Sequence, residues 1–168
     1  MGKLNSNKIV ISLGTNLGNK KKNLQIAIKH IRSQCNIIQV SKIYETEPWG
    51  YHSKNHFLNM GLVLKWKENP NELLQFLKSI EFKMGREIKN VPKGYQDRII
   101  DLDILLYKNQ KVFQKDLIIP HPKIINRRFA LFILRDLFQD EIIPVFNKTA
   151  EFMLVQTSDN NNVILFNS

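Results

Sequence analysis

Two aspartates, Asp101 and Asp103, have the residue type and spacing that could do chemistry most directly. They lie in the run 98–107, where branched and apolar residues without Gly or Pro predict a β-strand. Because strand side chains alternate, both carboxylates are expected on one face. The opposite face would carry Ile100, Leu102, Ile104 and Leu106. Paired carboxylates suit Mg²⁺ that keeps several waters and takes oxygens from a substrate phosphate; the alternative is a solvated face with two surface acids.

The segment before this strand would bring arginines to the carboxylates. Residues 87–97 contain Pro92, Gly94, several charges and no periodicity, which predicts a long loop. Long loops in a compact domain are often lids over a site. Arg86 and Arg98 stand at the two ends of this loop. Together, the loop, the arginines and the carboxylates favour a site that clamps Mg²⁺-bound phosphates.

A strand predicted over 57–66 could bind another part of a substrate. Alternation places its large apolar residues on one face and Phe57, Asn59 and Gly61 on the other. An aromatic ring, an amide and a glycine suit a planar heterocycle, which would stack on Phe57 and hydrogen-bond to Asn59. The alternative is an edge strand with an ordinary wet face.

Two further segments carry residues suited to substrate contacts. In 45–52, Pro and Gly predict a loop, whose aromatic residues could contact a substrate or could anchor the loop. His121 lies between two prolines, in backbone expected to be extended, just before a helix predicted over 124–138. Arg127 and Arg128 in the first turns of that helix oppose its dipole, and a bound anion would relieve this. His121 and the arginines are therefore candidate phosphate contacts.

The other elements complete a single α+β domain. Apolar periodicity predicts strands over 9–13, 37–44, 111–113 and 163–166, and helices over 23–32, 69–84 and 150–154. The 69–84 helix has a strong start signal, with Asn69 as N-cap, Pro70 at N1 and Glu72 in a capping-box position. Gly14 and Gly18 lack the spacing of a Walker A loop and are interpreted as turn formers.

Composition narrows the class of protein. The chain has 168 residues, enough for one domain with a real core, and no apolar run long enough to span a membrane. It shows no signal-peptide pattern, and the single cysteine, Cys35, allows neither an internal disulfide nor a cysteine-based zinc site. A cytoplasmic protein fits these features. The formal charge of +10 favours an anionic partner, such as a polyphosphate, nucleic acid or acidic membrane, although compositional drift would give the same sum.

Several segments, in order along the chain, resemble the 6-hydroxymethyl-7,8-dihydropterin pyrophosphokinase family. They are LGTNLG at 13–18, YETEPWG at 44–50, FLN at 57–59, IE at 80–81, GR at 85–86, RIIDLDIL at 98–105, IPHP at 119–122 and RRF at 127–129. Each piece alone is weak, but their shared order and spacing make the resemblance specific. The family moves a pyrophosphoryl group from ATP to a pterin alcohol in folate biosynthesis, and AMP is released.

The resemblance implies a fold and a set of site residues. The fold is a ferredoxin-like two-layer α+β sandwich, mostly antiparallel, with helices on one face and the active site on the other. The catalytic residues would be Arg86, Arg98, Asp101 and Asp103, with two Mg²⁺ ions on the aspartates. ATP would contact Glu81, Arg86, Arg98, His121 and Arg127. The pterin would lie between Phe57 and Phe129, with Asn59, Thr46 and Trp49 at its edge. Residues 1–168 would form one pyrophosphokinase domain, and 87–97 its catalytic lid.

The chain departs from the family pattern in the lid. Asp97 stands where the family usually has Pro, and residues 94–97 replace its aromatic-Gly-Pro segment, in which Tyr95 would stand in for the aromatic. Both changes concern lid closure and nucleotide affinity. The segment after Phe138 has no role that the resemblance assigns.

Two other functions are alternatives. A ferredoxin-like RNA-binding module would use exposed aromatics and the positive charge, but two aspartates on the binding face and the lack of an RNP-type aromatic run oppose it. A Mg²⁺-dependent nucleotidyltransferase would release pyrophosphate instead of AMP. We expect a monomer that binds ATP and 6-hydroxymethyl-7,8-dihydropterin and has no nucleic-acid or membrane partner.

Overall fold

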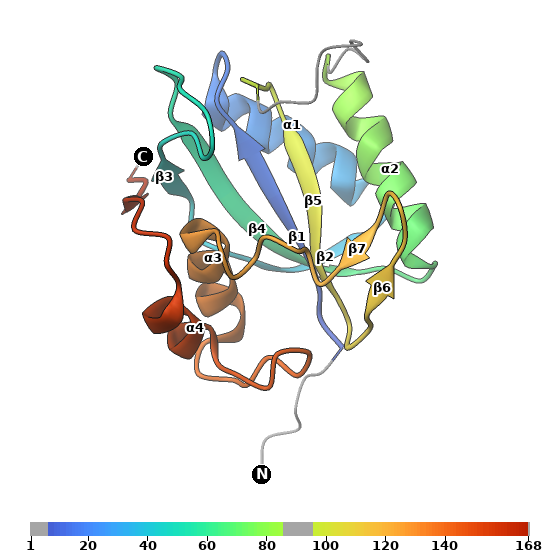
Figure 1. The fold of residues 1–168 in the computed structure, drawn as a ribbon. Helices are drawn as coiled ribbons and strands as arrows, with labels where there is room; N and C mark the ends of the chain where they lie inside the picture. The colour runs from blue at the N-terminus through green and yellow to red at the C-terminus, as the bar shows by residue number, and fades with distance from the viewer. Residues whose placement is uncertain (1–6, 86–95, 168) are drawn as a thin grey trace.

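The computed structural model describes residues 7–85 and 96–167. The strands are β1 (Ile9–Thr15), β2 (Asn36–Val40), β3 (Tyr44–Thr46), β4 (Phe57–Lys65), β5 (Asp101–Tyr107), β6 (Val112–Phe113), β7 (Ile118–Ile119) and β8 (Val163–Leu165). The helices are α1 (Lys20–Arg32), α2 (Pro70–Lys83), α3 (Arg128–Phe138) and α4 (Ala150–Gln156). Figure 1 shows α1 and α2 on one side of the main sheet, and α3 with α4 on the other.

The main sheet has the predicted ferredoxin-like arrangement. Its strand order is β5-β1-β4-β3-β8, β2 also pairs with β4, and each of these pairings is antiparallel. The chain therefore runs β1-α1-β2-β4-α2-β5 through a split β-α-β pattern, with β1 between β4 and β5. The predicted α+β class is confirmed. Helix α3 adds to the predicted arrangement, because it covers part of the face that carries the site.

Strand alternation builds the core under α1 and α2. Leu13 of β1, Leu62 of β4 and Leu102 of β5 point to this face and pack with apolar residues of both helices. The Asn69 side chain accepts a hydrogen bond from the backbone of Glu72, whose own side chain accepts one from the backbone of Asn69, so the predicted capping box begins α2. This face carries the larger of the two core clusters, and the opposite face carries a smaller one under α3.

A bulge in β5 changes the alternation that the sequence predicts. Val10 pairs with Leu106 and Ile11 with Ile104, so Leu105 is an extra residue in the β1–β5 ladder. Leu105 and Leu106 both join the core on the α3 side. The prediction that Leu106 shares a face with Leu102 and Ile104 is therefore wrong, because the bulge reverses the pattern after Ile104.

Helix α3 lies directly on β4 because Gly61 has no side chain. A Cβ atom at Gly61 would lie 2.2 Å from Ile133 Cγ2 of α3. The helix begins at Arg128, after turns, and not at residue 124 as predicted. It covers Val10 and Val63 and leaves the rest of this sheet face open for a pocket.

The C-terminal segment, to which the sequence assigned no role, extends the sheet and caps α3. Strand β8 pairs with β3, where Val163 lies opposite Thr46. The Asp159 carboxylate accepts a hydrogen bond from the backbone N–H of Arg128 at 2.7 Å. The anion expected at the start of this helix is thus supplied, at least at Arg128, by the chain itself.

Candidate functional site

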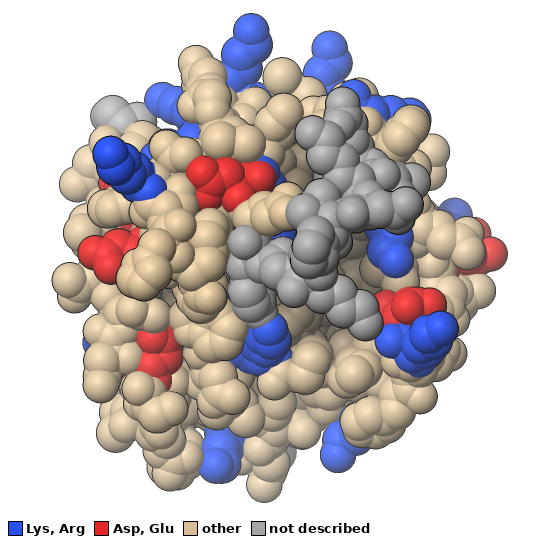
Figure 2. All heavy atoms as spheres, turned by 45° about the horizontal axis from the view of Figure 1, so that its top comes forward, with Lys and Arg blue, Asp and Glu red and all other residues tan. Residues whose placement is uncertain are grey.

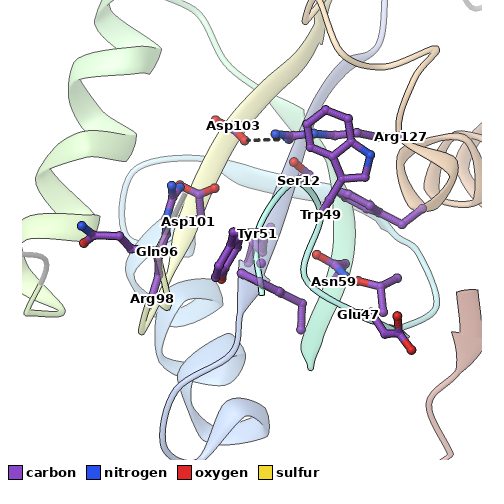
Figure 3. A pocket seen from close by; sticks show the side chains of 15 residues that line it. Ser12, Glu47, Trp49, Tyr51, Asn59, Gln96, Arg98, Asp101, Asp103 and Arg127 are labelled. Atoms are coloured by element: carbon purple, nitrogen blue, oxygen red, sulfur yellow. Dashed lines mark hydrogen bonds and ion pairs between the residues drawn. The ribbon is translucent and has the colours of Figure 1, made fainter. Parts of the chain in front are cut away.

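A pocket of about 550 Å³, its open mouth included, lies on the sheet face that α3 leaves uncovered. Its walls come from β1, β4 and β5, the loop after β3, the segment before β5 and the start of α3 (Figure 3). It is lined by Ser12, Leu13, Gly14, Thr46, Glu47, Trp49, Tyr51, Phe57, Asn59, Gln96, Arg98, Asp101, Asp103, Arg127 and Phe129. Distant parts of the chain therefore meet here.

Most of the predicted site residues lie in this one pocket. The proposed pterin contacts Thr46, Trp49, Phe57, Asn59 and Phe129 all line it, as do Arg98, Asp101, Asp103 and Arg127. Glu81 and His121 do not line it. Arg86 and residues 87–95 of the predicted lid lie outside the described residues.

The floor of the pocket follows from the strand register. Gly14 of β1 lies between Asp101 of β5 and Asn59 of β4, and in the next row Ser12 lies between Asp103 and Gly61. Residues directly opposite each other in antiparallel strands share a face, so the acid pair and Asn59 project to the same side. Two strand spacings, roughly 10 Å, separate β5 from β4. Glycine at position 14 keeps the path between them free of a side chain.

Gly14 is therefore a floor residue of the pocket and not the predicted turn former. A Cβ atom there would lie 3.2 Å from Asn59 Oδ1 and 3.7 Å from the Phe57 ring. Gly18, with φ of +62°, is the residue that does make the turn before α1. Ser12 and Gly14 alternate along β1 with Ile11 and Leu13, which face the core. This alternation is the sequence signal that places both residues on the face of the site.

Each carboxylate of the acid pair has an arginine beside it. Arg98 Nη1 lies 2.7 Å from Asp101 Oδ1, and Arg127 Nη1 lies 3.9 Å from Asp103 Oδ2. Burial would lower the pKa of Arg98, but the neighbouring carboxylates, Asp101 first, raise it above its ordinary value. Burial lowers the pKa of Arg127 more than Asp103 and Asp101 raise it. These opposite charges relieve the repulsion between the two acids.

The backbone between the acids is held by Glu81 of α2. Its carboxylate accepts a hydrogen bond from the Leu102 N–H at 2.7 Å, and the residue is 6 % exposed. Strand β5 is at the edge of the sheet, so this N–H points away from β1 and needs another acceptor. The contact fixes the strand segment that carries both aspartates. The predicted contact of Glu81 with ATP stays a prediction.

One end of the pocket offers an amide and aromatic rings. The buried Asn59 donates from Nδ2 to Thr46 Oγ1 at 2.8 Å, which fixes the plane of its amide. Phe57 lies opposite Thr46 in the β3–β4 ladder, and Phe129 enters from the first turn of α3. The guanidinium of Arg127 lies over the Trp49 ring, 5.4 Å from its centroid. This end suits a flat ring with hydrogen-bonding edges.

His121 lies outside the pocket lining but is near enough to Arg127 and Asp101 for their charges to affect its pKa. Its backbone N–H donates to Leu105 O at 2.9 Å, and its Nδ1 accepts from the Lys123 N–H at 3.2 Å. Burial, followed by the positive charge of Arg127, lowers the pKa of His121 to about 4. At neutral pH the ring is therefore uncharged and carries its proton on Nε2, where it can donate to an anion.

The acid pair has the donor set expected for Mg²⁺ shared with a substrate. Within residues 7–85 and 96–167, no group of three or more His, Cys, Asp or Glu side chains could hold a metal ion. Asp101 and Asp103 are a pair of carboxylates from one strand, and both are partly exposed in the pocket. A cation here would take its remaining oxygens from water and a bound phosphate, which is the usual mode of Mg²⁺.

Sequence reasoning missed several residues of the site. Ser12, Glu47 and Gln96 line the pocket and were not singled out. Asp97, noted only as a departure in the lid, accepts hydrogen bonds from the turn after β1 and the loop after β3. These contacts join segments far apart in the sequence, so no local sequence pattern predicts them.

Comparison with known proteins identifies relatives over most of the chain. The family model for 7,8-dihydro-6-hydroxymethylpterin-pyrophosphokinase matches residues 10–139. The chain is 37 % identical over 138 residues to the 2-amino-4-hydroxy-6-hydroxymethyldihydropteridine pyrophosphokinase of Bacillus subtilis, covering 80 % of each chain. It is 32 % identical over 140 residues to the enzyme of that name from Aquifex aeolicus, covering 83 % of this chain and 86 % of the other.

Solved structures agree on the fold. The wild-type HPPK-DHPS of Plasmodium falciparum with pteroate superposes with a TM-score of 0.69 at 18 % identity. The alignment covers 89 % of this chain and 42 % of that one, so this chain spans less than half of the solved protein. At this identity the match shows a common architecture only.

Proposed function

Because this chain belongs to the 7,8-dihydro-6-hydroxymethylpterin-pyrophosphokinase family, we propose that it transfers pyrophosphate from ATP to 6-hydroxymethyl-7,8-dihydropterin in folate biosynthesis. The observation that carries the proposal is the row Asp101–Gly14–Asn59 across three strands. It provides a phosphate end, an open floor and an edge-reading amide within roughly 10 Å. This arrangement suits a flat ring joined by one carbon to an oxygen that attacks a phosphate.

The ring end would bind the pterin. Phe57 and Phe129 would hold the ring by stacking, and Asn59 with Thr46 would read its polar edge. The hydrogen bond to Thr46 already fixes the orientation of the Asn59 amide, so little conformational entropy is lost there when the ligand binds. Trp49 would close the side of the pocket.

The phosphate end would bind ATP. Arg98 and Arg127 would neutralise charge on the polyphosphate, and His121 would donate a hydrogen bond as a neutral ring. Asp101 and Asp103 would hold Mg²⁺, and we propose two ions. Bound there with ATP, Mg²⁺ supplies charge neutralisation of the phosphates and acidification of the attacking hydroxyl. Arg86 and a lid over 87–97 remain proposals from the family resemblance.

The reaction would depend on positioning and electrostatics. The pterin hydroxymethyl oxygen would attack the β-phosphorus, and the bond from that phosphorus to the oxygen bridging to the α-phosphate would break, so that AMP leaves. Holding both substrates in line across the Gly14 floor supplies most of what such a transfer needs. Arg98 would stabilise the charge that develops during the step.

The test is to measure AMP formation from ATP with and without the pterin alcohol. We expect AMP only when both substrates are present. Asp101→Ala and Asp103→Ala should each lower turnover by at least about 1,000-fold, a barrier increase of ~4 kcal/mol. Binding of the pterin, followed by its own fluorescence, should change little. Asp140→Ala is the matched control, because Asp140 is exposed after α3.

Other outcomes would identify the alternatives. Pyrophosphate release instead of AMP would indicate a nucleotidyltransferase. Salt-dependent binding of RNA without turnover of ATP would indicate an RNA-binding module. Near-normal turnover in either aspartate variant would refute the assignment of the acid pair. On the face that Figure 2 shows, the Lys and Arg side chains of the described residues are scattered and do not gather into the stripe typical of an RNA-binding surface.

A cytoplasmic location and a monomeric state are also part of the proposal. Among the described residues, no helix has the length and apolar character needed to cross a bilayer. Gel filtration with light scattering would test the monomer.

A further inference from the structure

Asp97 collects hydrogen bonds from two separate parts of the chain. Asn16 Nδ2 and the Tyr51 hydroxyl donate to Oδ1 at 2.7 and 3.0 Å. Ser53 Oγ and Asn55 Nδ2 donate to Oδ2 at 2.9 and 2.7 Å. All four donors are neutral side chains. Burial raises the pKa of Asp97, but these hydrogen bonds bring it below its ordinary value, so the carboxylate is charged at neutral pH.

The first partner, Asn16, ties this network to the backbone of Arg98. The Asn16 N–H donates to Arg98 O at 3.0 Å, and Asn16 Oδ1 accepts from the Arg98 N–H at 2.6 Å. Asn16 is 3 % exposed, so this pair of hydrogen bonds is protected from water. The Nδ2 group of the same Asn16 side chain donates to Asp97. Asp97 therefore helps to hold the backbone from which the Arg98 guanidinium reaches Asp101.

The other three partners belong to the loop between β3 and β4. Residues 47–56 contain bends but no helix, strand or hydrogen-bonded turn. The loop nevertheless contributes Trp49 and Tyr51 to the wall of the pocket. Tyr51, Ser53 and Asn55 all end on the Asp97 carboxylate, and Asn55 O also accepts from Asn16 Nδ2 at 3.2 Å. Three side chains of this loop are thus held by one carboxylate, in addition to the Lys20 Nζ hydrogen bond to His56 O at 2.9 Å and the cations of Lys123 and Arg127 over the Trp49 ring.

We propose that Asp97 is a positioning residue that holds the 47–56 loop against the Arg98 backbone and so shapes the ring-binding end of the pocket. The identity of the ring as a pterin rests on the proposed function. Asp97 itself does not line the pocket. Its effect passes through Tyr51 and Trp49 on one side and through Asn16 on the other.

The experiment compares Asp97→Ala, Asp97→Asn and the control Asp140→Ala in a Trp66→Phe background. Trp66 stacks on Phe76 at 5.4 Å, and its removal leaves Trp49 as the single tryptophan. We expect Asp97→Ala to raise the KM for the pterin about tenfold, equivalent to ~1.4 kcal/mol, with a smaller change in the KM for ATP. Acrylamide quenching of Trp49 should increase at least about twofold, since lost hydrogen bonds expose the loop.

Two further variants separate positioning from general instability. Asp97→Asn keeps an acceptor for Asn16 and Tyr51 but turns an amide donor toward Asn55, so it should give an intermediate KM and intermediate quenching. Ser53→Ala combined with Asn55→Ala removes the donors to Oδ2 and leaves Asp97 in place; it should also raise the pterin KM and Trp49 quenching. This double variant decides the question if Asp97→Ala does not fold.

The outcomes also separate this proposal from the proposed function. If the parent chain forms no AMP, the proposed function is refuted. The quenching of Trp49 in the Asp97 variants would still test whether Asp97 holds the loop. If AMP forms, but the pterin KM and the quenching of Asp97→Ala both stay within about twofold of the parent, equivalent to ~0.4 kcal/mol, the positioning role is overturned. Equal rises in both KM values, with unchanged quenching, would also overturn it.

Discussion

Replacement of Glu81 tests whether this buried carboxylate acts through strand β5. The Leu102 N–H that it accepts lies between Asp101 and Asp103, at the open edge of the sheet. In Glu81→Ala that N–H loses its charged acceptor. In Glu81→Gln the amide carbonyl oxygen can still accept the hydrogen bond from the Leu102 N–H. The two variants therefore differ in the hydrogen bond and share the loss of charge.

The size of the effect follows from burial and from the charge on the acceptor. A hydrogen bond to a charged group contributes ~1.5–3 kcal/mol, and removal of the buried charge offsets part of this loss. We expect Glu81→Ala to destabilise the fold by about 2 kcal/mol, which lowers the Tm by about 4–8 °C for a domain of this size. Glu81→Gln should cost about 1 kcal/mol or less. Because both aspartates move with β5, turnover of Glu81→Ala should fall roughly 10–100-fold.

The assay is thermal unfolding by circular dichroism, together with kcat and the KM for ATP. Glu151→Ala is the control, since Glu151 is an exposed residue whose ion pair with Arg135, at 3.5 Å, is expected to contribute less than ~1 kcal/mol. The reasoning is refuted if Glu81→Ala melts within about 1 °C of the parent. If Glu81→Gln raises the KM for ATP as much as Glu81→Ala and leaves the Tm unchanged, the carboxylate acts on the nucleotide directly.

Two other predictions concern α3 and His121. Asp159→Ala removes the carboxylate that caps Arg128 N, so it should cost ~0.5–2 kcal/mol of stability and weaken pterin binding through Phe129, whereas Asp159→Asn should largely restore both; calorimetric titration and melting curves check this. The pKa of His121 falls from 6.5 to about 4 on folding, so the unfolded chain binds more protons between these values and stability is lost as the pH falls from 6.5 toward 4. In His121→Gln this loss should be smaller, and a profile of urea unfolding that is as steep as the parent's would contradict the assignment.

The faces of the central strands could be predicted because side-chain alternation depends only on the backbone. This placed Phe57, Asn59, Asp101 and Asp103 on the non-core face, and all four line one pocket. The same rule failed at Leu106, because a bulge adds a residue without changing the apolar character of the sequence around it. The local sequence pattern predicts that a strand forms, whereas the position of a bulge depends on how that strand pairs with its neighbour.

Contacts between distant segments could not be predicted in this way. Asp97 and Asn16 are 81 positions apart, and Arg128 and Asp159 are 31 apart. Nothing in the neighbourhood of either acid in the sequence indicates its partner, because each hydrogen bond depends on the completed sheet. The family resemblance marks Asp97 as a departure, but that departure does not indicate which side chains donate hydrogen bonds to it.

The bulge and the glycines explain how one sheet face serves both packing and binding. Beyond the bulge, Leu105 and Leu106 join Val10 and Val63 under α3, which lies close because Gly61 has no Cβ. Before the bulge, regular alternation keeps the aspartates pointing to the same side, with Gly14 between them and Asn59. Because α3 starts where the apolar part of the face ends, its N-cap residue Arg127 and its first-turn residue Phe129 both reach the pocket. The packing of α3 on the sheet therefore positions ligand contacts, and substitutions under α3 should disturb the pocket as well as stability.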